Sequence, residues 1–127
     1  KTQADASAAG EQFKAGELLA PRKTFVQNFK KAGLKLPIIH KGWFADFTPE
    51  YVPESIIFAF FDGDFYESIA DSFRLCDGKF QETATIIVDD YANEALPGAA
   101  RAVDKWLSGN QQYSLATEAS LAIIRRS

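Results

Sequence analysis

Two continuous apolar runs constrain the fold of this chain more than any other feature. Residues 55–61 read Ser-Ile-Ile-Phe-Ala-Phe-Phe and residues 85–88 read Thr-Ile-Ile-Val, with a helical pattern between them. Apolar runs without polar alternation are typical of parallel strands that are buried on both faces. A helix is the usual crossover between two such strands. We therefore predict an α/β fold in which these two runs are neighbouring parallel strands.

Acidic residues come directly after each of these predicted strands. Asp62 and Asp64 come after the first strand, and Asp89 and Asp90 come after the second. Right-handed crossovers bring the carboxyl ends of parallel strands to one edge of the sheet, where α/β proteins bind their ligands. Four carboxylates there repel one another unless a cation or a proton compensates them, and hard divalent cations prefer oxygen ligands. The edge is therefore a candidate metal site. The alternative is that each Asp only ends a strand or caps a helix.

The remaining patterns extend this fold to the order α-β-β-α-β-α-β-β. Helices are predicted at 21–32, 66–77 and 97–107, with the apolar face of the second continuing to Phe80, and further strands at 36–40, 112–117 and 121–125. The last two strands are close enough in sequence to form an antiparallel hairpin. Pro37 removes a ladder donor, so 36–40 is an edge strand or the start of one. Residues 1–16 are rich in Ala, Gln and Gly and are predicted to be a flexible lead-in to a single domain at 17–127.

Composition excludes several classes of function. The chain has 127 residues and a formal net charge of −3, so nucleic acid or an anionic membrane gains no electrostatic support as a partner. No apolar run is long enough to span a bilayer and no signal-peptide pattern is present. The single cysteine, Cys76, fits a reducing cytoplasm, and its place on an apolar helix face indicates a core residue. Because the chain begins at Lys1 and lacks methionine, we expect a fragment or a processed product.

Other candidate residues have two interpretations each. Gly42, Trp43 and Phe44 form an aromatic turn, which is either a wall for a planar ring or an anchor of the loop in the core. His40, the only histidine, is more consistent with a partly exposed strand residue than with a catalyst. Arg101 is expected on a solvated helix face.

Several segments resemble the macrocin O-methyltransferase family. Residues 58–68 read Phe-Ala-Phe-Phe-Asp-Gly-Asp-Phe-Tyr-Glu-Ser, and residues 86–91 read Ile-Ile-Val-Asp-Asp-Tyr. The Gly-Trp-Phe-Ala-Asp segment at 42–46 and the Pro-Gly-Ala-Ala-Arg-Ala-Val-Asp segment at 97–104 are also similar to the family. The resemblance implies an S-adenosylmethionine-dependent and Mg²⁺-dependent enzyme that methylates a sugar-like hydroxyl of a small-molecule glycoside. It also implies part of a class I, Rossmann-like methyltransferase sheet that ends in an antiparallel hairpin.

The resemblance assigns a separate role to each acidic residue. Carried over position by position, Asp62, Asp89 and Asp90 are the metal ligands, and Asp64 is the general base that accepts the hydroxyl proton. This division is chemically sound, because a metal-bound hydroxyl has a lowered pKa and a nearby carboxylate can deprotonate it.

The resemblance also places Gly42, Trp43 and Phe44 near the adenine side of the cofactor. The family's glycine-rich turn after the first strand, and the next strand with its ribose-binding acid, have no counterpart in this sequence. Those strands belong between 36–40 and 55–61 in the family sheet, so the chain resembles the C-terminal portion of such an enzyme.

Two other functions stay open. One is a non-catalytic, truncated methyltransferase-like domain that binds a cation or a partner, with a homo-oligomer as one form. The other is a carboxylate-based Mg²⁺ phosphohydrolase, against which no phosphate-cradling glycine loop follows either acidic strand.

Overall fold

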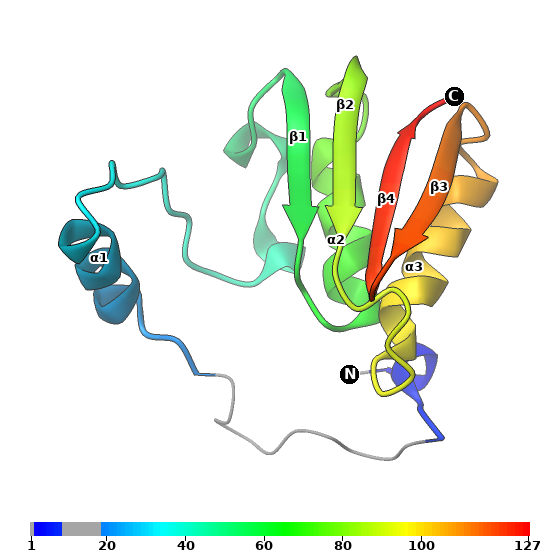
Figure 1. Ribbon diagram of the computed structural model, residues 1–127, viewed down its shortest axis with the longest axis horizontal. Coiled ribbons are helices and arrows are strands. Elements are labelled where there is room, and N and C mark those ends of the chain that lie inside the picture. The colour runs from blue at the N-terminus through cyan, green and yellow to red at the C-terminus, as the bar shows by residue number, and fades with distance from the viewer. Residues whose placement is uncertain (1, 9–18) are drawn as a thin grey trace.

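A computed structural model of the protein describes residues 2–8 and 19–127, which form a mixed α/β fold (Figure 1). The described elements are η1 (Gln3–Asp5), α1 (Arg22–Lys31), η2 (Phe44–Asp46), η3 (Pro49–Tyr51), β1 (Ile56–Phe61), α2 (Tyr66–Cys76), β2 (Phe80–Val88), α3 (Pro97–Ser108), β3 (Tyr113–Glu118) and β4 (Leu121–Arg126). The four strands have the order β1-β2-β4-β3. β1 and β2 are parallel, and β4 pairs antiparallel with both β2 and β3. The predicted α/β class, the parallel pair and the terminal hairpin are confirmed.

The core lies between the sheet and the helices α2 and α3, which pack side by side on one sheet face (Figure 1). Alternate strand residues point into it, and Ile86, Val88 and Ile124 are fully buried there. Phe73 of α2 stacks on Trp106 of α3 with their ring centroids 4.4 Å apart. This packing fixes both helices against the strands and so fixes the loops that follow β1 and β2.

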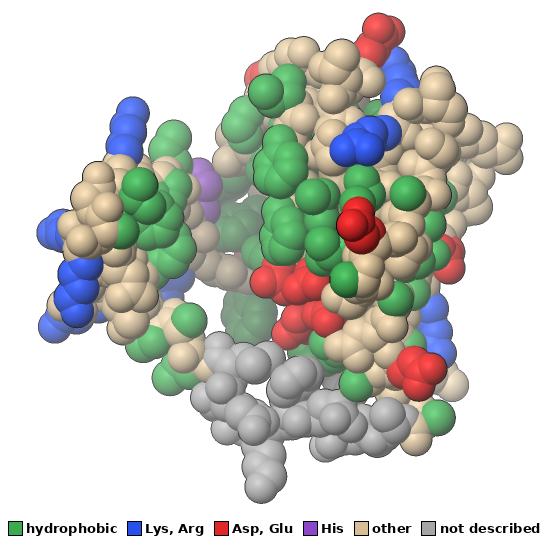
Figure 2. Space-filling model, viewed as in Figure 1, with side chains coloured by type: hydrophobic (Ala, Val, Ile, Leu, Met, Phe, Trp, Pro, Cys, Tyr) green, Lys and Arg blue, Asp and Glu red, His purple; other side chains and the backbone are tan. Residues whose placement is uncertain are grey.

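The opposite face of β1 is apolar and open to solvent. Phe58 is 58% exposed and Phe60 is 49% exposed, and Figure 2 shows hydrophobic side chains gathered on this face. β1 is one of the two edge strands of the sheet, so its outer edge has no strand partner among the described residues. An apolar edge strand of this kind is ordinarily covered or paired.

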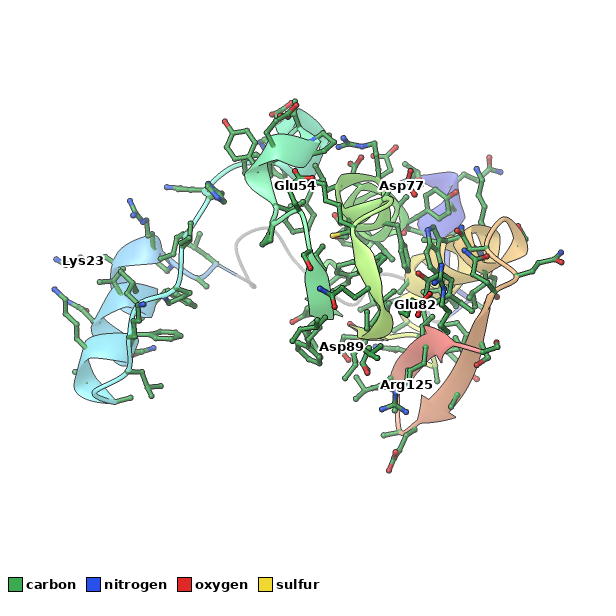
Figure 3. All side chains as sticks on the ribbon, turned by 90° about the horizontal axis from the view of Figure 1, so that it is seen from above. Lys23, Glu54, Asp77, Glu82, Asp89 and Arg125 are labelled. Atoms are coloured by element: carbon green, nitrogen blue, oxygen red, sulfur yellow. The ribbon has the colours of Figure 1, made fainter. Side chains whose placement is uncertain are left out.

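The predicted strand at 36–40 is wrong. The structure has no helix or strand from Leu34 to Lys41, and Ile38 is 88% exposed. Strand geometry needs a partner to accept its backbone hydrogen bonds, and none of the described strands pairs with this segment. The helix before it is confirmed as α1, which stands apart from the sheet in Figure 1 and, with Lys23 labelled, in Figure 3.

The assignment of Phe80 to a helical face is also wrong, because Phe80 begins β2. Gly78 has a φ of 71°, a left-handed conformation that ends α2 and turns the chain into the strand. Of the predicted lead-in at 1–16, only residues 2–8 lie in the described ranges, and they contain η1. None of the helices in the described ranges has the length and hydropathy that a membrane crossing requires.

Candidate functional site

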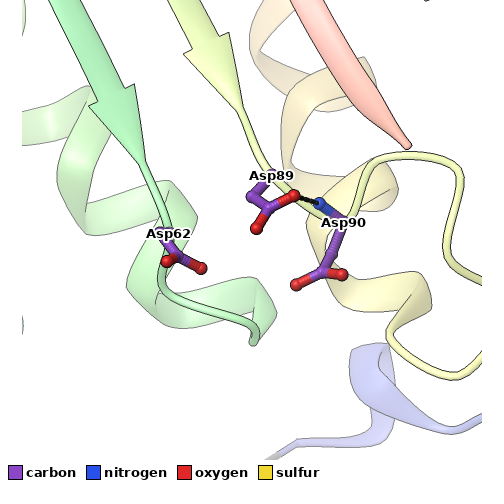
Figure 4. A group of neighbouring side chains, drawn as sticks. All are labelled: Asp62, Asp89 and Asp90. Carbon is purple, nitrogen blue, oxygen red and sulfur yellow. Dashed lines mark hydrogen bonds between the residues drawn. The ribbon is translucent and has the colours of Figure 1, made fainter. Parts of the chain in front are cut away.

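The strand ladder between β1 and β2 brings the two acidic clusters together. Phe61 pairs with Val88 at the end of the ladder, and the next amide, Asp89 N–H, donates to the Phe61 carbonyl at 2.9 Å. Asp62 and Asp89 therefore leave neighbouring strands at the same level. Ligand oxygens of Asp62, Asp89 and Asp90 all lie within 4.8 Å of one another (Figure 4). The prediction that both clusters share one edge is confirmed.

Two of the acidic residues have a backbone conformation that is rare outside glycine. Asp64 and Asp90 both have a φ of 59°. Asp tolerates the left-handed region better than most residues, but the conformation is still strained and persists only where the surroundings hold it. Asp90 is held by its neighbours: its N–H donates to Asp89 Oδ1 at 2.9 Å, and Asn93 Nδ2 donates to Asp90 Oδ1 at 2.8 Å. Strained residues of this kind cluster at functional sites.

The electrostatics of the edge disfavour four separate negative charges. Burial, followed by the charges of Asp90 and Asp62 and a hydrogen bond with Asp90, raises the pKa of Asp64 to about 6. Burial, followed by the charges of Asp89 and Asp90, also raises the pKa of Asp62. No cationic side chain is among the causes of either shift. The edge therefore favours either a bound proton or a bound cation.

The donor set fits a hard divalent cation. In an octahedral Mg²⁺ site with bonds of about 2.1 Å, neighbouring oxygen ligands are about 3.0 Å apart and opposite ones about 4.2 Å apart. One carboxylate oxygen from each of Asp62, Asp89 and Asp90 lies within 4.8 Å of the other two, so the three side chains converge on the space that one such ion would occupy. Carboxylate oxygens are the ligands that Mg²⁺ prefers in proteins, and no ion pair among the described residues engages these three.

The aromatic turn lies beside this edge. A Cβ atom on Gly63 would be 3.5 Å from the Phe44 ring, so Phe44 borders the loop between Asp62 and Asp64. Arg74 of α2 holds the turn, because its guanidinium donates to the Phe44 carbonyl at 3.1 Å and to the Phe47 carbonyl at 3.2 Å.

Gly42 and Trp43 precede that contact in the chain. A Cβ atom on Gly42 would be 3.1 Å from the Phe47 ring, while the Trp43 side chain is 80% exposed. The turn thus anchors the loop through Phe44 and leaves one large aromatic surface open.

His40 and Cys76, the only histidine and the only cysteine of the sequence, make their contacts with groups other than the acidic residues. The His40 ring packs edge-on against the Tyr51 ring at 5.0 Å and belongs to an aromatic group with Phe47. Cys76 is buried in the core, and this burial raises the pKa of its thiol. Its predicted core position is confirmed.

The sequence analysis missed a buried carboxylate next to the site. Asp5 is 3% exposed, and its Oδ1 accepts the Tyr66 N–H at the start of α2 at 2.7 Å. The Thr2–Asp5 spacing is a capping pattern and gives a local signal, but it says nothing of a partner 61 residues away. Arg101 is exposed, as expected, and from this position it donates to the carbonyls of Ala4 and Ala6.

The sheet with its terminal hairpin has the fold of known O-methyltransferase structures. The structure of the O-methyltransferase NovP matches with a TM-score of 0.77 and 24% sequence identity, covering 98% of this chain and 57% of NovP. The apo structure of CalS11, a TDP-rhamnose 3'-O-methyltransferase in calicheamicin biosynthesis, matches with a TM-score of 0.57 and 24% identity, covering 67% of this chain and 39% of CalS11. The chain therefore spans about half the length of these solved structures.

The family model for macrocin-O-methyltransferase (TylF) matches residues 1–115, and the chain belongs to this family. Comparison with curated protein sequences gives no match. The family resemblance stated from the sequence is confirmed.

Proposed function

We propose that this chain carries the metal and acceptor half of an S-adenosylmethionine-dependent, Mg²⁺-dependent O-methyltransferase that methylates a sugar-like hydroxyl of a small-molecule glycoside. The observation that carries the proposal is the convergence of Asp62, Asp89 and Asp90 within 4.8 Å in a member of the macrocin-O-methyltransferase family. TDP-rhamnose, the sugar nucleotide named for the structural neighbour CalS11, supports the acceptor class.

In this proposal, Asp62, Asp89 and Asp90 hold the cation. A bound Mg²⁺ would lower the pKa of an acceptor hydroxyl. Asn93 keeps the Asp90 carboxylate in place, and Asp89 accepts the Asp90 amide, so two of the three ligands are already oriented. Such preorganisation supports a metal site, because ligands that are already oriented cost less to order.

Asp64 is the proposed general base. It follows Asp62 by two residues, is half-buried and is held in a left-handed conformation at the same edge. With a pKa of about 6 it is mostly ionised at pH 7 and able to accept a proton, which suits a base at neutral pH. The acceptor oxygen would attack the sulfonium methyl group, forming a C–O bond and breaking the C–S bond, while its proton goes to Asp64.

Gly42, Trp43 and Phe44 are the proposed contacts on the adenine side of the cofactor. Phe44 borders the Gly63 loop, and the open Trp43 surface offers a stacking platform for a planar ring. We further propose a cytoplasmic protein, in which residues 17–127 are the C-terminal portion of a methyltransferase domain. The exposed apolar face of β1 supports this division, because such a face is ordinarily covered.

The convergence of Asp62, Asp89 and Asp90 also favours a second candidate function, a cation-binding domain that does not transfer methyl groups by itself. Because the chain spans 57% of NovP, binding of S-adenosylmethionine is the property that separates the two candidates.

Calorimetry with MgCl₂ and with S-adenosylmethionine tests both candidates. The test variant carries Asp89→Ala and Asp90→Ala. The charge-matched control carries Asp77→Ala and Glu82→Ala, two exposed acidic residues at the end of the sheet opposite to the edge. Cation binding that persists in the test variant would refute the metal assignment, whereas the control is expected to bind like the wild type.

Transfer of a labelled methyl group to TDP-rhamnose is the activity assay. Mg²⁺-dependent transfer that is lost in Asp64→Asn supports the methyltransferase proposal. Cation binding without cofactor binding or transfer supports the second candidate.

A further inference from the structure

The segment formed by residues 2–8, which we call the N-terminal strap, docks at the end of the sheet that carries the acidic edge. Its anchor is Asp5, a carboxylate that is 3% exposed. One oxygen, Oδ1, accepts the Tyr66 N–H at 2.7 Å, and the other, Oδ2, accepts the Thr2 N–H at 2.8 Å and the Thr2 hydroxyl at 3.2 Å. Both oxygens are thus engaged by donors within the protein.

The strap is also held by one side chain of α3 and by one backbone carbonyl just before α3. Arg101 donates to the carbonyls of Ala4 and Ala6 on either side of the anchor, and the Ser7 hydroxyl donates to the Glu94 carbonyl at 2.5 Å. Residues of both α2 and α3 therefore hold the segment that carries Asp5.

Gly98 shows how closely this site is fitted. A Cβ atom on Gly98 would lie 1.8 Å from Asp5 Oδ1 and 2.7 Å from the Tyr66 nitrogen. Both atoms of the hydrogen bond lie against the Gly98 backbone, so a side chain at this position would displace at least one of them. Gly98 thus leaves the space that the Asp5 carboxylate occupies, a role separate from the start of α3.

The bonded amide is the first one of α2, immediately after the loop with the acidic residues. The N-cap residue of α2, Phe65, has no side-chain oxygen with which to cap the helix. Asp5 supplies that acceptor from 61 residues away, and its negative charge at a helix N-terminus is favourable. Between this fixed amide and the end of β1 lie only residues 62–65, which include the left-handed Asp64.

We propose that Asp5 is a positioning residue that fixes the start of α2 and thereby the loop bearing Asp62 and Asp64. Asp5 acts through the Tyr66 amide and is not itself a metal ligand, because its two oxygens are engaged elsewhere. The strained conformation of Asp64 persists because the loop is fixed at both ends, by the β1–β2 ladder on one side and by Asp5 on the other. The effect on cation affinity rests on the proposed function, whereas the effect on the loop does not.

Two substitutions separate the hydrogen bond from the charge. Asp5→Asn removes the charge and the acceptor for the Thr2 N–H but keeps one carbonyl oxygen that can accept the Tyr66 N–H, whereas Asp5→Ala removes every acceptor. We expect Asp5→Ala to weaken Mg²⁺ binding about 10-fold in calorimetry, as loss of an outer positioning group does at metal sites, and Asp5→Asn to restore most of the affinity. Asp77→Ala, at the opposite end of α2, is the control for loss of one charge and is expected to bind like the wild type.

Backbone amide spectra and hydrogen exchange provide the readout that is independent of metal. In Asp5→Ala the Tyr66 amide should lose its protection and the amide signals of residues 62–65 should shift, while Asp5→Asn should resemble the wild type. If wild-type protein does not bind Mg²⁺, the proposed function fails, and these spectra alone decide the positioning role.

Three results would overturn the proposal: equal weakening in Asp5→Ala and Asp5→Asn, wild-type affinity in both, or unchanged signals for residues 62–65 in Asp5→Ala. If Asp5→Ala does not fold, Arg101→Ala is the alternative variant, because it removes the hydrogen bonds to the Ala4 and Ala6 carbonyls and leaves Asp5 unchanged. It is then expected to shift the same amide signals, and their invariance would refute the proposal.

Discussion

The metal-free protein is expected to become more stable as the pH falls from 7 to 4.5. The pKa of Asp64 is about 6 in the folded protein, above its ordinary value of 3.8. The folded state therefore binds this proton more readily than the unfolded state between these two values. The linkage relation makes the free energy of unfolding rise as the pH falls through about 6, with the gain complete below about 3.8. The raised pKa of Asp62 acts in the same direction.

The magnitude follows from the shift. The folded-state pKa of Asp64 exceeds its ordinary value by about 2.2, which corresponds to at most about 3 kcal/mol at 1.36 kcal/mol per pKa unit. Asp64 is only partly buried, so water screens the charges that act on it, and we reduce the expected gain between pH 7 and pH 4.5 to about 1 kcal/mol.

Urea unfolding in EDTA at both pH values, followed by circular dichroism, measures this gain. Asp64→Asn cannot ionise, so it should be about 1 kcal/mol more stable than the wild type at pH 7 and should lose most of the pH dependence. Asp77→Asn, an exposed residue at the end of α2, is the control and should keep the wild-type pH dependence. The reasoning is refuted if Asp64→Asn keeps the full pH dependence of the wild type.

Three further predictions concern packing and the cation. Trp106→Ala removes the ring stacked on Phe73 and should cost about 3–5 kcal/mol of unfolding free energy in urea titrations; a cost below 1 kcal/mol would contradict the packing described here. Gly63→Ala places a Cβ atom 2.6 Å from the Ser68 Cβ and should cost about 1–3 kcal/mol, whereas Gly109→Ala, whose Cβ would meet its nearest atom at 3.8 Å, should unfold nearly like the wild type in the same titration. Saturating Mg²⁺ should raise the melting temperature at pH 7 and raise it less at pH 5, because protons compete for the same carboxylates; an equal rise at both pH values in calorimetric melts would argue against carboxylate ligands.

The acidic edge could be predicted from sequence because its geometry follows from simple rules. Two apolar runs with a helix between them specify parallel neighbours, and the crossover hand then brings Asp62 and Asp89 to the same edge. The rules concern only strand period and connection hand, so they succeed without knowledge of side-chain packing.

The strand at 36–40 could not be judged in the same way. Its apolar pattern is typical of a strand, but a strand exists only when a neighbour pairs with it. The assignment of Phe80 to a helical face was wrong for a related reason. Its spacing from Phe73 and Cys76 suits a helix, but the left-handed Gly78 between Cys76 and Phe80 ends that helix. Local periodicity does not reveal either event.

Asp5 was beyond local reasoning because its partner lies far along the chain. A carboxylate near Thr2 predicts a local cap, and the local bonds to Thr2 do form. The bond to Tyr66 depends on the space above Gly98, which exists only after the two helices have packed. The rest of the predicted lead-in, residues 9–16, lies outside the described ranges.

The contacts of the N-terminal strap have a consequence for the order of folding. Residues 2–8 are synthesised before the groups that hold them, the Tyr66 amide and the Arg101 guanidinium. The strap therefore has no site to occupy until α3 has been made and packed, and the loop after β1 stays unfastened at one end until then. Because such distant contacts form slowly, the acidic edge should be among the last parts of the protein to acquire its final shape.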